Sequence, residues 1–312
     1  MQVAQVVANQ VLVMFLLIGI GVVCDRFGIT TPRGIKQMST VLMYIVAPSL
    51  IITSYQRDYS PEGAQRLLIC VGMAVLTHVV GILVSTLLFR KNERLFPNDR
   101  HRMARFASVY SNAGFMGYPV LMAVMGSEGI FYGVAYVAIF MLFNWTHGVL
   151  LLKGRMDWKA AKSVLVNPGI IGVTIGLLLY FTQLRLPGPV NTVLDYMGSL
   201  NTPVAMIVIG SYVSRVNWWK TLRNLSVYLV SAVRLLLIPV LMLCLFGLFG
   251  LRGEVLLAVL IPASCPVAAV ASIFATRFGG DALYGSELVA FSTVFSLVTL
   301  PVMVFLAALL FP

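Results

Sequence analysis

Charged residues are scarce in this chain. Only 11% of its 312 residues are Asp, Glu, Lys or Arg, whereas a soluble domain carries roughly 25%. This deficit excludes a soluble globular protein. Hydrophobic residues make up 59% of the chain, and the mean hydropathy is +0.93. The composition therefore predicts an integral membrane protein.

The patterns of common metal sites and hydrolases are also missing. The chain has only 4 cysteines, no C-x-x-C pair and no H-E-x-x-H sequence. The run Phe278-Gly279-Gly280-Asp281 differs from the Gly-x-Gly-Asp pattern of aspartyl membrane proteases. We therefore expect neither an enzyme nor a protein that depends on a metal or another cofactor.

Long polar segments are absent too, so no separate soluble module is expected. The longest polar segment between spans, 153–167, is predicted to be a cytoplasmic linker. Spanning a bilayer as a helix takes about 20 apolar residues. Ten stretches meet this length, which predicts an all-α protein with ten transmembrane helices. They cover about 5–24, 37–55, 64–89, 103–125, 129–152, 168–184, 190–213, 224–249, 254–277 and 284–311.

The net charge of +11 follows from membrane topology rather than from nucleic-acid binding. With the N-terminus outside, 17 of the 22 Lys and Arg residues fall in cytoplasmic loops. Cytoplasmic loops of membrane proteins carry an excess of these residues. The distribution predicts a multi-pass protein of the plasma (inner) membrane with both termini outside, in the periplasm.

Two of the apolar stretches contain helix-breaking residues. The first break is predicted within 111–119 (SNAGFMGYP), and the second within 261–266 (IPASCP), in the corresponding part of the other half. An interrupted membrane helix leaves backbone groups that hydrocarbon cannot satisfy, so it occurs where protein or a water-filled cavity pairs them. Paired interruptions of this kind indicate a substrate site.

The two halves resemble inverted repeats. Five spans in each half place the halves upside down relative to each other. Pro32 and Pro48 bracket the second span, and Pro187 and Pro203 bracket the seventh at the same separation. We expect a first five-helix repeat at 1–152 and a second at 168–312.

The chain resembles the auxin efflux carrier family, which includes bacterial malonate and organic-acid permeases. The most specific match is the run Asn112 to Pro119, which is similar to the family's Asn-x-x-x-x-Gly-x-Pro crossover in helix 4. Supporting matches are Asn167-Pro168, Arg234 with Pro239, and Cys265-Pro266. The short linker is typical of the compact bacterial branch.

This resemblance implies a fold and a mechanism. Ten helices would form two inverted repeats in which the broken helices 4 and 9 cross. Helices 1, 2, 6 and 7 would form a support domain, and helices 3–5 and 8–10 a transport domain that moves as an elevator, in a homodimer joined through the support domain. One position departs from the family: Ala271 stands where the second crossover proline is expected and Pro266 is the nearer helix breaker, so the second break is predicted to lie earlier or to be milder.

A half-helix that begins inside the membrane presents unpaired N–H groups and a positive dipole end, which suit a carboxylate. Helix 4 is expected to restart near 115–118 and helix 9 near 267–269. Alternatively, Asn112 only caps the broken helix, and the glycines only allow close helix packing. The predicted substrate-binding residues are Ser111, Asn112, Gly114, Gly117, Pro119, Ser264, Pro266 and Ser272.

Four ionisable residues are further candidates. Arg234 lies inside a span, where it attracts the anion or gates the path, or alternatively has a structural role, in which it holds carbonyls freed by a break or snorkels to the cytoplasmic interface. His78 and His147 are candidate proton carriers, or neutral core histidines. Glu62 is a candidate for the same proton relay, or a solvated loop carboxylate.

The leading hypothesis is a secondary active or potential-driven transporter of small organic anions, mono- or dicarboxylates first. Its partners are then the carboxylate substrate and the lipid bilayer, with no nucleic acid. The alternatives are a sodium- or proton-coupled importer of the bile-acid symporter type, which shares the crossover architecture, and an anion channel that uses the same positive half-helix ends. A sodium site is disfavoured because no carboxylate lies clearly in mid-membrane.

Overall fold

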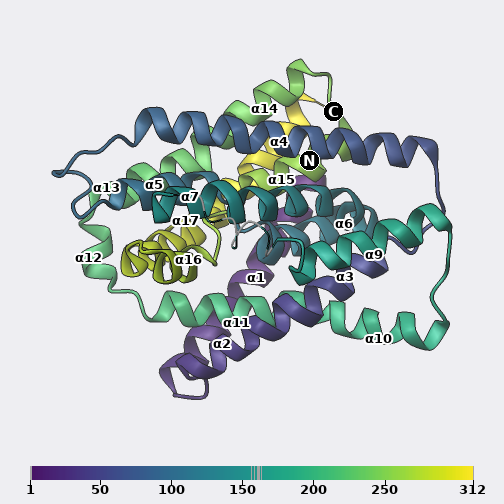
Figure 1. Cartoon of the computed structure of the whole chain (residues 1–312), viewed down its shortest axis with the longest axis horizontal. Helices are drawn as coiled ribbons and strands as arrows, with labels where there is room; N and C mark the ends of the chain where they lie inside the picture. Colours follow the sequence, from purple (N-terminus) through teal and green to yellow (C-terminus); the bar gives the residue numbers. More distant parts are fainter. Residues whose placement is uncertain (1, 156, 158, 160–161, 163, 312) are drawn as a thin grey trace.

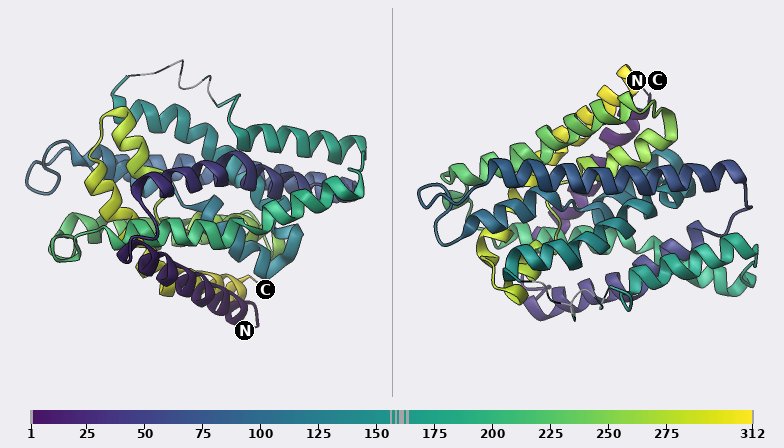
Figure 2. Two further views of the ribbon diagram at one scale, coloured as in Figure 1. Left: turned by 90° about the horizontal axis from the view of Figure 1, so that it is seen from below. Right: turned by 45° about the horizontal axis from the view of Figure 1, so that its top comes forward.

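The computed structural model describes residues 2–155, 157, 159, 162 and 164–311, so the predicted linker lies partly outside the described residues. Over the described part the chain is helical and forms no strand. Figure 1 shows α10 and α11 along one side of the molecule and α4 along the opposite side. The two ends of the chain lie close together in Figures 1 and 2.

The described part of the first half contains ten helical elements, of which three are single π-helical turns. They are α1 (Gln2–Arg26), α2 (Pro32–Val41), η1 (Leu42–Val46), α3 (Ala47–Ser54), α4 (Pro61–Leu88), α5 (Arg100–Val109), η2 (Ala113–Gly117), α6 (Tyr118–Phe143), η3 (Asn144–Gly148) and α7 (Val149–Lys153). Side chains cap two of the starts: Thr31 accepts from the N–H of Gly34, and Ser60 from that of Gly63.

The described part of the second half also contains ten helical elements, of which one is a π-helical turn. They are α9 (Pro168–Thr182), α10 (Gly188–Ser199), α11 (Asn201–Ser214), α12 (Trp218–Leu222), α13 (Leu225–Ala232), η4 (Val233–Leu237), α14 (Ile238–Leu248), α15 (Gly253–Ser264), α16 (Ala271–Phe278) and α17 (Ala282–Leu310). Asn167, Asn224 and Asp281 cap three of these helices through their side-chain oxygens.

Three of the π-helical turns precede a proline. Pro48, Pro119 and Pro239 each follow such a turn by two residues. A proline ring clashes with the carbonyl one turn earlier and donates no N–H, and a widened turn accommodates both defects. Proline therefore bends these spans without ending them.

Seven helical runs in the described part are long and apolar enough to cross a membrane, and 168–182 and 253–264 are shorter apolar helices. The longest run, 113–153, reverses direction at Gly126, where φ is +60°. A side chain added at Gly129 or Gly133 would lie within 2.5 Å of Leu121. In a straight helix twelve residues span about 18 Å, so the run is two antiparallel helices. The predicted boundary between 103–125 and 129–152 is confirmed.

Small residues bring two pairs of helices into close contact. Gly21 of α1 lies against the backbone of Ile207, and Gly210 of α11 lies against the carbonyl of Ile18. In the second pair, Gly172 of α9 meets Pro48 of α3. Such contacts allow membrane helices to pack through their backbones, where the hydrophobic effect offers no driving force.

Candidate functional site

The chain leaves helical geometry at both predicted breaks. The first interruption covers Tyr110–Asn112, between the end of α5 and the start of η2. Helical geometry resumes at Ala113 rather than near 115–118, so this expectation is wrong by two residues. The reason is that the π-helical turn absorbs Pro119, and the chain need not stay extended up to the proline.

The second interruption is longer. α15 ends at Ser264 and α16 begins at Ala271, which confirms a break that starts before Ala271. The predicted restart at 267–269 is wrong, because the N–H of Ala271 first closes a turn onto the carbonyl of Ala268, at 2.9 Å. The helix can begin only after this turn.

The two interruptions cross and pair with each other. Ser111 and Val267 form an isolated antiparallel bridge. The N–H of Asn112 donates to the carbonyl of Pro266 at 2.7 Å, and the N–H of Ala268 donates to that of Tyr110 at 2.9 Å. Each break therefore supplies partners for backbone groups that the other break frees, as the membrane interior requires.

Arg234 holds the carbonyl ends of both half-helices. Its side chain is 0% exposed, and Nη1 donates to the carbonyls of Ser108 and Val109 at 3.1 and 3.0 Å. Nη2 donates to the carbonyl of Ala263 in α15. Helix C-termini carry a partial negative charge, so a guanidinium there is favourable. These contacts support the structural alternative for Arg234.

A cavity of about 170 Å³, the crossing cavity, lies beside the paired breaks. Asn112 and Gly114 line it at the start of η2, and Ala268, Ala269 and Val270 line it just before α16. No side chain caps either of these helix starts. Both N-termini, with their positive dipole ends, therefore border one cavity.

Asn112 provides a polar side chain at this cavity. The residue is 5% exposed, and its Nδ2 has no hydrogen-bond partner among the residues that the structure describes. Its main-chain carbonyl accepts from the N–H of Met116 at 3.0 Å. The backbone of Asn112 thus starts the helix, while the side-chain amide remains a free donor, and buried donors are normally paired.

Sequence reasoning missed Arg277, Asn144 and Trp145 in the crossing cavity. The Arg277 guanidinium lies 5.4 Å from the centre of the Trp145 ring, in a cation–π contact. Arg277 is one of the 17 Lys and Arg residues that the predicted topology places in cytoplasmic loops. A usable signal was its place at the end of the short helix that follows the second break.

The other predicted substrate-binding residues divide among four places. Ser111 lines the crossing cavity, and its hydroxyl donates to that of Tyr136 at 3.4 Å. Gly117, Ser264 and Pro266 lie at or beside the crossing: Pro266 is in the second interruption, Ser264 ends α15, and a side chain at Gly117 would meet Cys265 at 3.5 Å. Pro119 lines a second cavity, and Ser272 packs against Gly285 of α17.

The predicted proton carriers do not line the crossing cavity. His78 is 1% exposed, with Nδ1 2.8 Å from the carbonyl of Ala74 in its own helix. His147 has Nδ1 2.9 Å from the hydroxyl of Tyr110, whose ring also packs against His78. Tyr110 therefore lies between both histidines. Glu62 is exposed in the first turn of α4.

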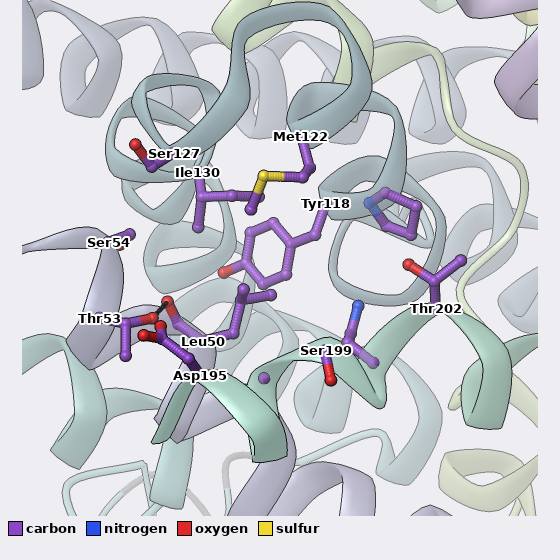
Figure 3. A pocket seen from close by; sticks show the side chains of 13 residues that line it. Leu50, Thr53, Ser54, Tyr118, Met122, Ser127, Ile130, Asp195, Ser199 and Thr202 are labelled. Atoms are coloured by element: carbon purple, nitrogen blue, oxygen red, sulfur yellow. Dashed lines mark hydrogen bonds between the residues drawn. The ribbon is translucent and has the colours of Figure 1, made fainter. Parts of the chain in front are cut away.

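The second cavity, of about 350 Å³, lies between α3, α6, α10 and α11 (Figure 3). Tyr118 lines it and also lines the crossing cavity. Sequence analysis did not select Tyr118, because an aromatic residue in an apolar span normally packs in the core. Its position between two cavities depends on the fold.

Comparisons with known proteins agree with one another. A family model described as membrane transport protein matches residues 6–163 and 154–304. An uncharacterized transporter from Methanothermobacter thermautotrophicus is 27% identical over 93% of this chain and 95% of its own. An uncharacterized transporter from Methanocaldococcus jannaschii is 24% identical over the same shares. A Rhizobium meliloti protein named "Putative malonate transporter" is 22% identical over 96% and 95%.

Proposed function

The chain belongs to the membrane transport protein family, and from this premise we propose that it is a secondary carrier of small organic anions, mono- or dicarboxylates first. Its relatives are transporters, and its apolar helices embed it in a membrane as a multi-pass protein. The substrate class, the mechanism and the coupling are the parts that we propose.

One observation carries the choice of an anion: two uncapped helix N-termini border the same cavity as the free amide of Asn112. Partial positive charges and N–H donors stabilise a carboxylate. Arg277 adds a full positive charge to the lining, which contains no carboxylate among the described residues. The electrostatic character of this cavity therefore favours an anion.

The size of the crossing cavity restricts the substrate. Its volume of about 170 Å³ is below the roughly 300 Å³ at which drug-sized sites begin. A short mono- or dicarboxylate suits this space. The name of the Rhizobium meliloti relative makes malonate the first acid to test.

The proposal includes ten membrane crossings in two inverted repeats, 1–152 and 168–312, joined by a cytoplasmic linker. Ser111 and Pro266, at the two breaks, have the same sequence separation as Pro32 and Pro187. The helix contacts also correspond: α1 packs on α11, as α9 packs on α3. Inverted repeats would relate the first pair to the second.

The proposal also includes an elevator motion. The crossing cavity lies at the boundary between the two proposed domains: Met43, Ala47 and Ile51 line it from the support domain, and the crossing lines it from the transport domain. A site at this boundary is carried across when the transport domain slides. The support domain would form the homodimer, in the inner membrane with both termini outside.

Sodium coupling is not part of the proposal. Sodium sites in broken-helix carriers use carbonyl oxygens at half-helix C-termini. Here carbonyls of Val109 and Ala263 at those ends accept hydrogen bonds from Arg234. Export of an anion needs no coupling ion, because an inside-negative potential contributes about 2.3 kcal/mol per charge per 100 mV.

Uptake into proteoliposomes tests the proposal. The panel is malonate, malate, succinate and indole acetate, each with an imposed pH, sodium or voltage gradient. We expect saturable uptake and counterflow that follow the voltage and do not require sodium. Single-channel currents would contradict a carrier, and uptake that depends on a sodium gradient would support the symporter alternative.

A further inference from the structure

Two cavities lie on either side of one side chain. The crossing cavity of about 170 Å³ and the second cavity of about 350 Å³ both take lining residues from α6, and α3 also borders both. Ile51 of α3 lines the crossing cavity, and Leu50 and Ser54 line the second. Among the residues that line the two cavities, Tyr118 alone belongs to both.

The side chain of Tyr118 separates the two cavities. It is 1% exposed, although it borders both spaces, so its ring fills the room between them. In Figure 3 the ring lies in the middle of the lining and its hydroxyl points to the side of Thr53 and Asp195. This hydroxyl has no hydrogen-bond partner in the described part of the chain. Leaving a buried hydroxyl unpaired costs about 1–3 kcal/mol, so a passing solute or water gains by pairing it.

Polar groups line the second cavity. Asn201 is 3% exposed, and neither atom of its amide has a partner within the described residues. The hydroxyls of Thr53, Ser54 and Ser199 donate to carbonyls of their own helices. Their oxygen lone pairs remain available as acceptors. The cavity therefore suits a small solute that both donates and accepts hydrogen bonds.

The two cavities differ in charge. Arg277 lines the crossing cavity, whereas Asp195 lines the second and no Lys or Arg does so among the described residues. An anion is therefore held in the crossing cavity and is not retained in the second. This difference fits a binding place followed by a place of release.

We propose that the two cavities are consecutive stations on one solute path and that the Tyr118 side chain closes the path between them. The crossing cavity binds the solute, and the second cavity, lined by hydroxyl and amide groups, receives it on the opposite side of the ring. The identity of the solute rests on the proposed function. The closure by Tyr118 does not depend on it.

Leak through liposomes tests the closure without knowledge of the substrate. Vesicles with Tyr118→Ala are expected to lose chloride at least tenfold faster than wild-type vesicles, since the two cavities would join. Tyr118→Phe keeps the ring and is expected to stay as tight as wild type. Tyr132→Ala is the matched control, because Tyr132 is a 2% exposed tyrosine of α6, beyond the reversal at Gly126, that lines neither cavity. A folded Tyr118→Ala protein without leak would overturn the proposal.

Thiol labelling provides a second test if Tyr118→Ala does not fold. Tyr118→Cys is placed in a background whose 4 native cysteines are changed to alanine. We expect a membrane-impermeant thiol reagent to modify it when added to either side of the vesicle. Modification from one side only, or from neither, would contradict a residue that borders both stations. Failure of carboxylate uptake would alter neither readout, so it is distinguishable.

Discussion

The two breaks share a backbone arrangement and differ in side chains. The first is short, Tyr110–Asn112, and contributes an amide to the crossing cavity. The second is longer, Cys265–Val270, and contributes to the cavity only Ala268, Ala269 and Val270. Both donate and accept main-chain hydrogen bonds across the crossing.

This difference separates two tasks. Backbone pairing and helix dipoles need no particular side chain, so the second break can be built from small apolar residues. Selective hydrogen bonding to a solute needs a polar side chain, and the first break supplies it through Asn112. We therefore expect substitutions at the first break to affect transport and those around the second to affect stability.

The largest expected effect is a loss of stability on substitution of Arg234, whose guanidinium contacts carbonyls next to both breaks. Arg234→Gln removes the cation from the carbonyls of Ser108, Val109 and Ala263. Removing one partner of a buried charged interaction typically costs about 3–5 kcal/mol, and we expect a similar loss of stability here. Thermal unfolding in detergent measures it. Arg252→Gln, at an exposed arginine that also donates to a carbonyl, is the control and should unfold as wild type does. A stable Arg234→Gln protein that transports nothing would instead favour the anion-attracting role.

The next effect is on transport alone. Asn112→Ala removes one donor to an anion, and a hydrogen bond to a charged group is worth about 1.5–3 kcal/mol. We expect initial uptake to fall by about 10- to 100-fold, at unchanged melting temperature. Val267→Ala is the matched variant, because Val267 lies in the second break and pairs with Ser111 of the first. It should keep uptake within about twofold. Equal losses of uptake in the two variants would contradict the expectation that only the first break binds the solute through a side chain.

A third variant tests the contact between the second break and α17. The buried N–H of Val267 donates to the Ser292 hydroxyl of α17 at 3.0 Å. Ser292→Ala leaves this N–H unpaired, and we expect a loss of about 1–3 kcal/mol in unfolding free energy. Ser296→Ala is the control, since among the described residues that hydroxyl bonds only to the carbonyl of Thr293, in its own helix. Identical melting curves for both variants would contradict a special need for this contact.

The smallest effect concerns the charge at the crossing cavity. Arg277→Gln removes an exposed cation, which contributes on the order of 0.5–1 kcal/mol to attraction of an anion. We expect KM for a carboxylate to rise about two- to fivefold without a change in kcat. High salt should shrink the difference, because it screens exposed charges. Arg223→Gln, whose guanidinium also lies over a tryptophan ring, outside both cavities, should leave KM unchanged.

Much of the crossing could be predicted from the sequence, because helix breakers in apolar spans have few explanations. Asn112 and Pro266 were selected on this ground, and the structure places them in hydrogen-bond contact. The exact restarts could not be predicted. They depend on a π-helical turn before Pro119 and on a turn that ends at Ala271.

Tyr118 and Arg277 were not selected from the sequence, for a different reason. Tyr118 and Arg277 belong to residue types that are ordinary in a core and at a membrane interface. Their roles arise because α6 and α16 face cavities at those positions. For Arg234 the sequence leaves open an anion-attracting or gating role and a structural role, and the carbonyls around its guanidinium support the structural one.

Composition and the order of apolar stretches by themselves determined that this chain enters a membrane as helices and interrupts two of them. These properties depend on local chemistry, namely the transfer of side chains into hydrocarbon and the missing N–H of proline. Only the tertiary structure decided which groups meet: two N-termini at one cavity, two C-termini at Arg234, and Tyr118 between two spaces. Contacts between distant segments depend on how whole helices pack, and no local pattern encodes them.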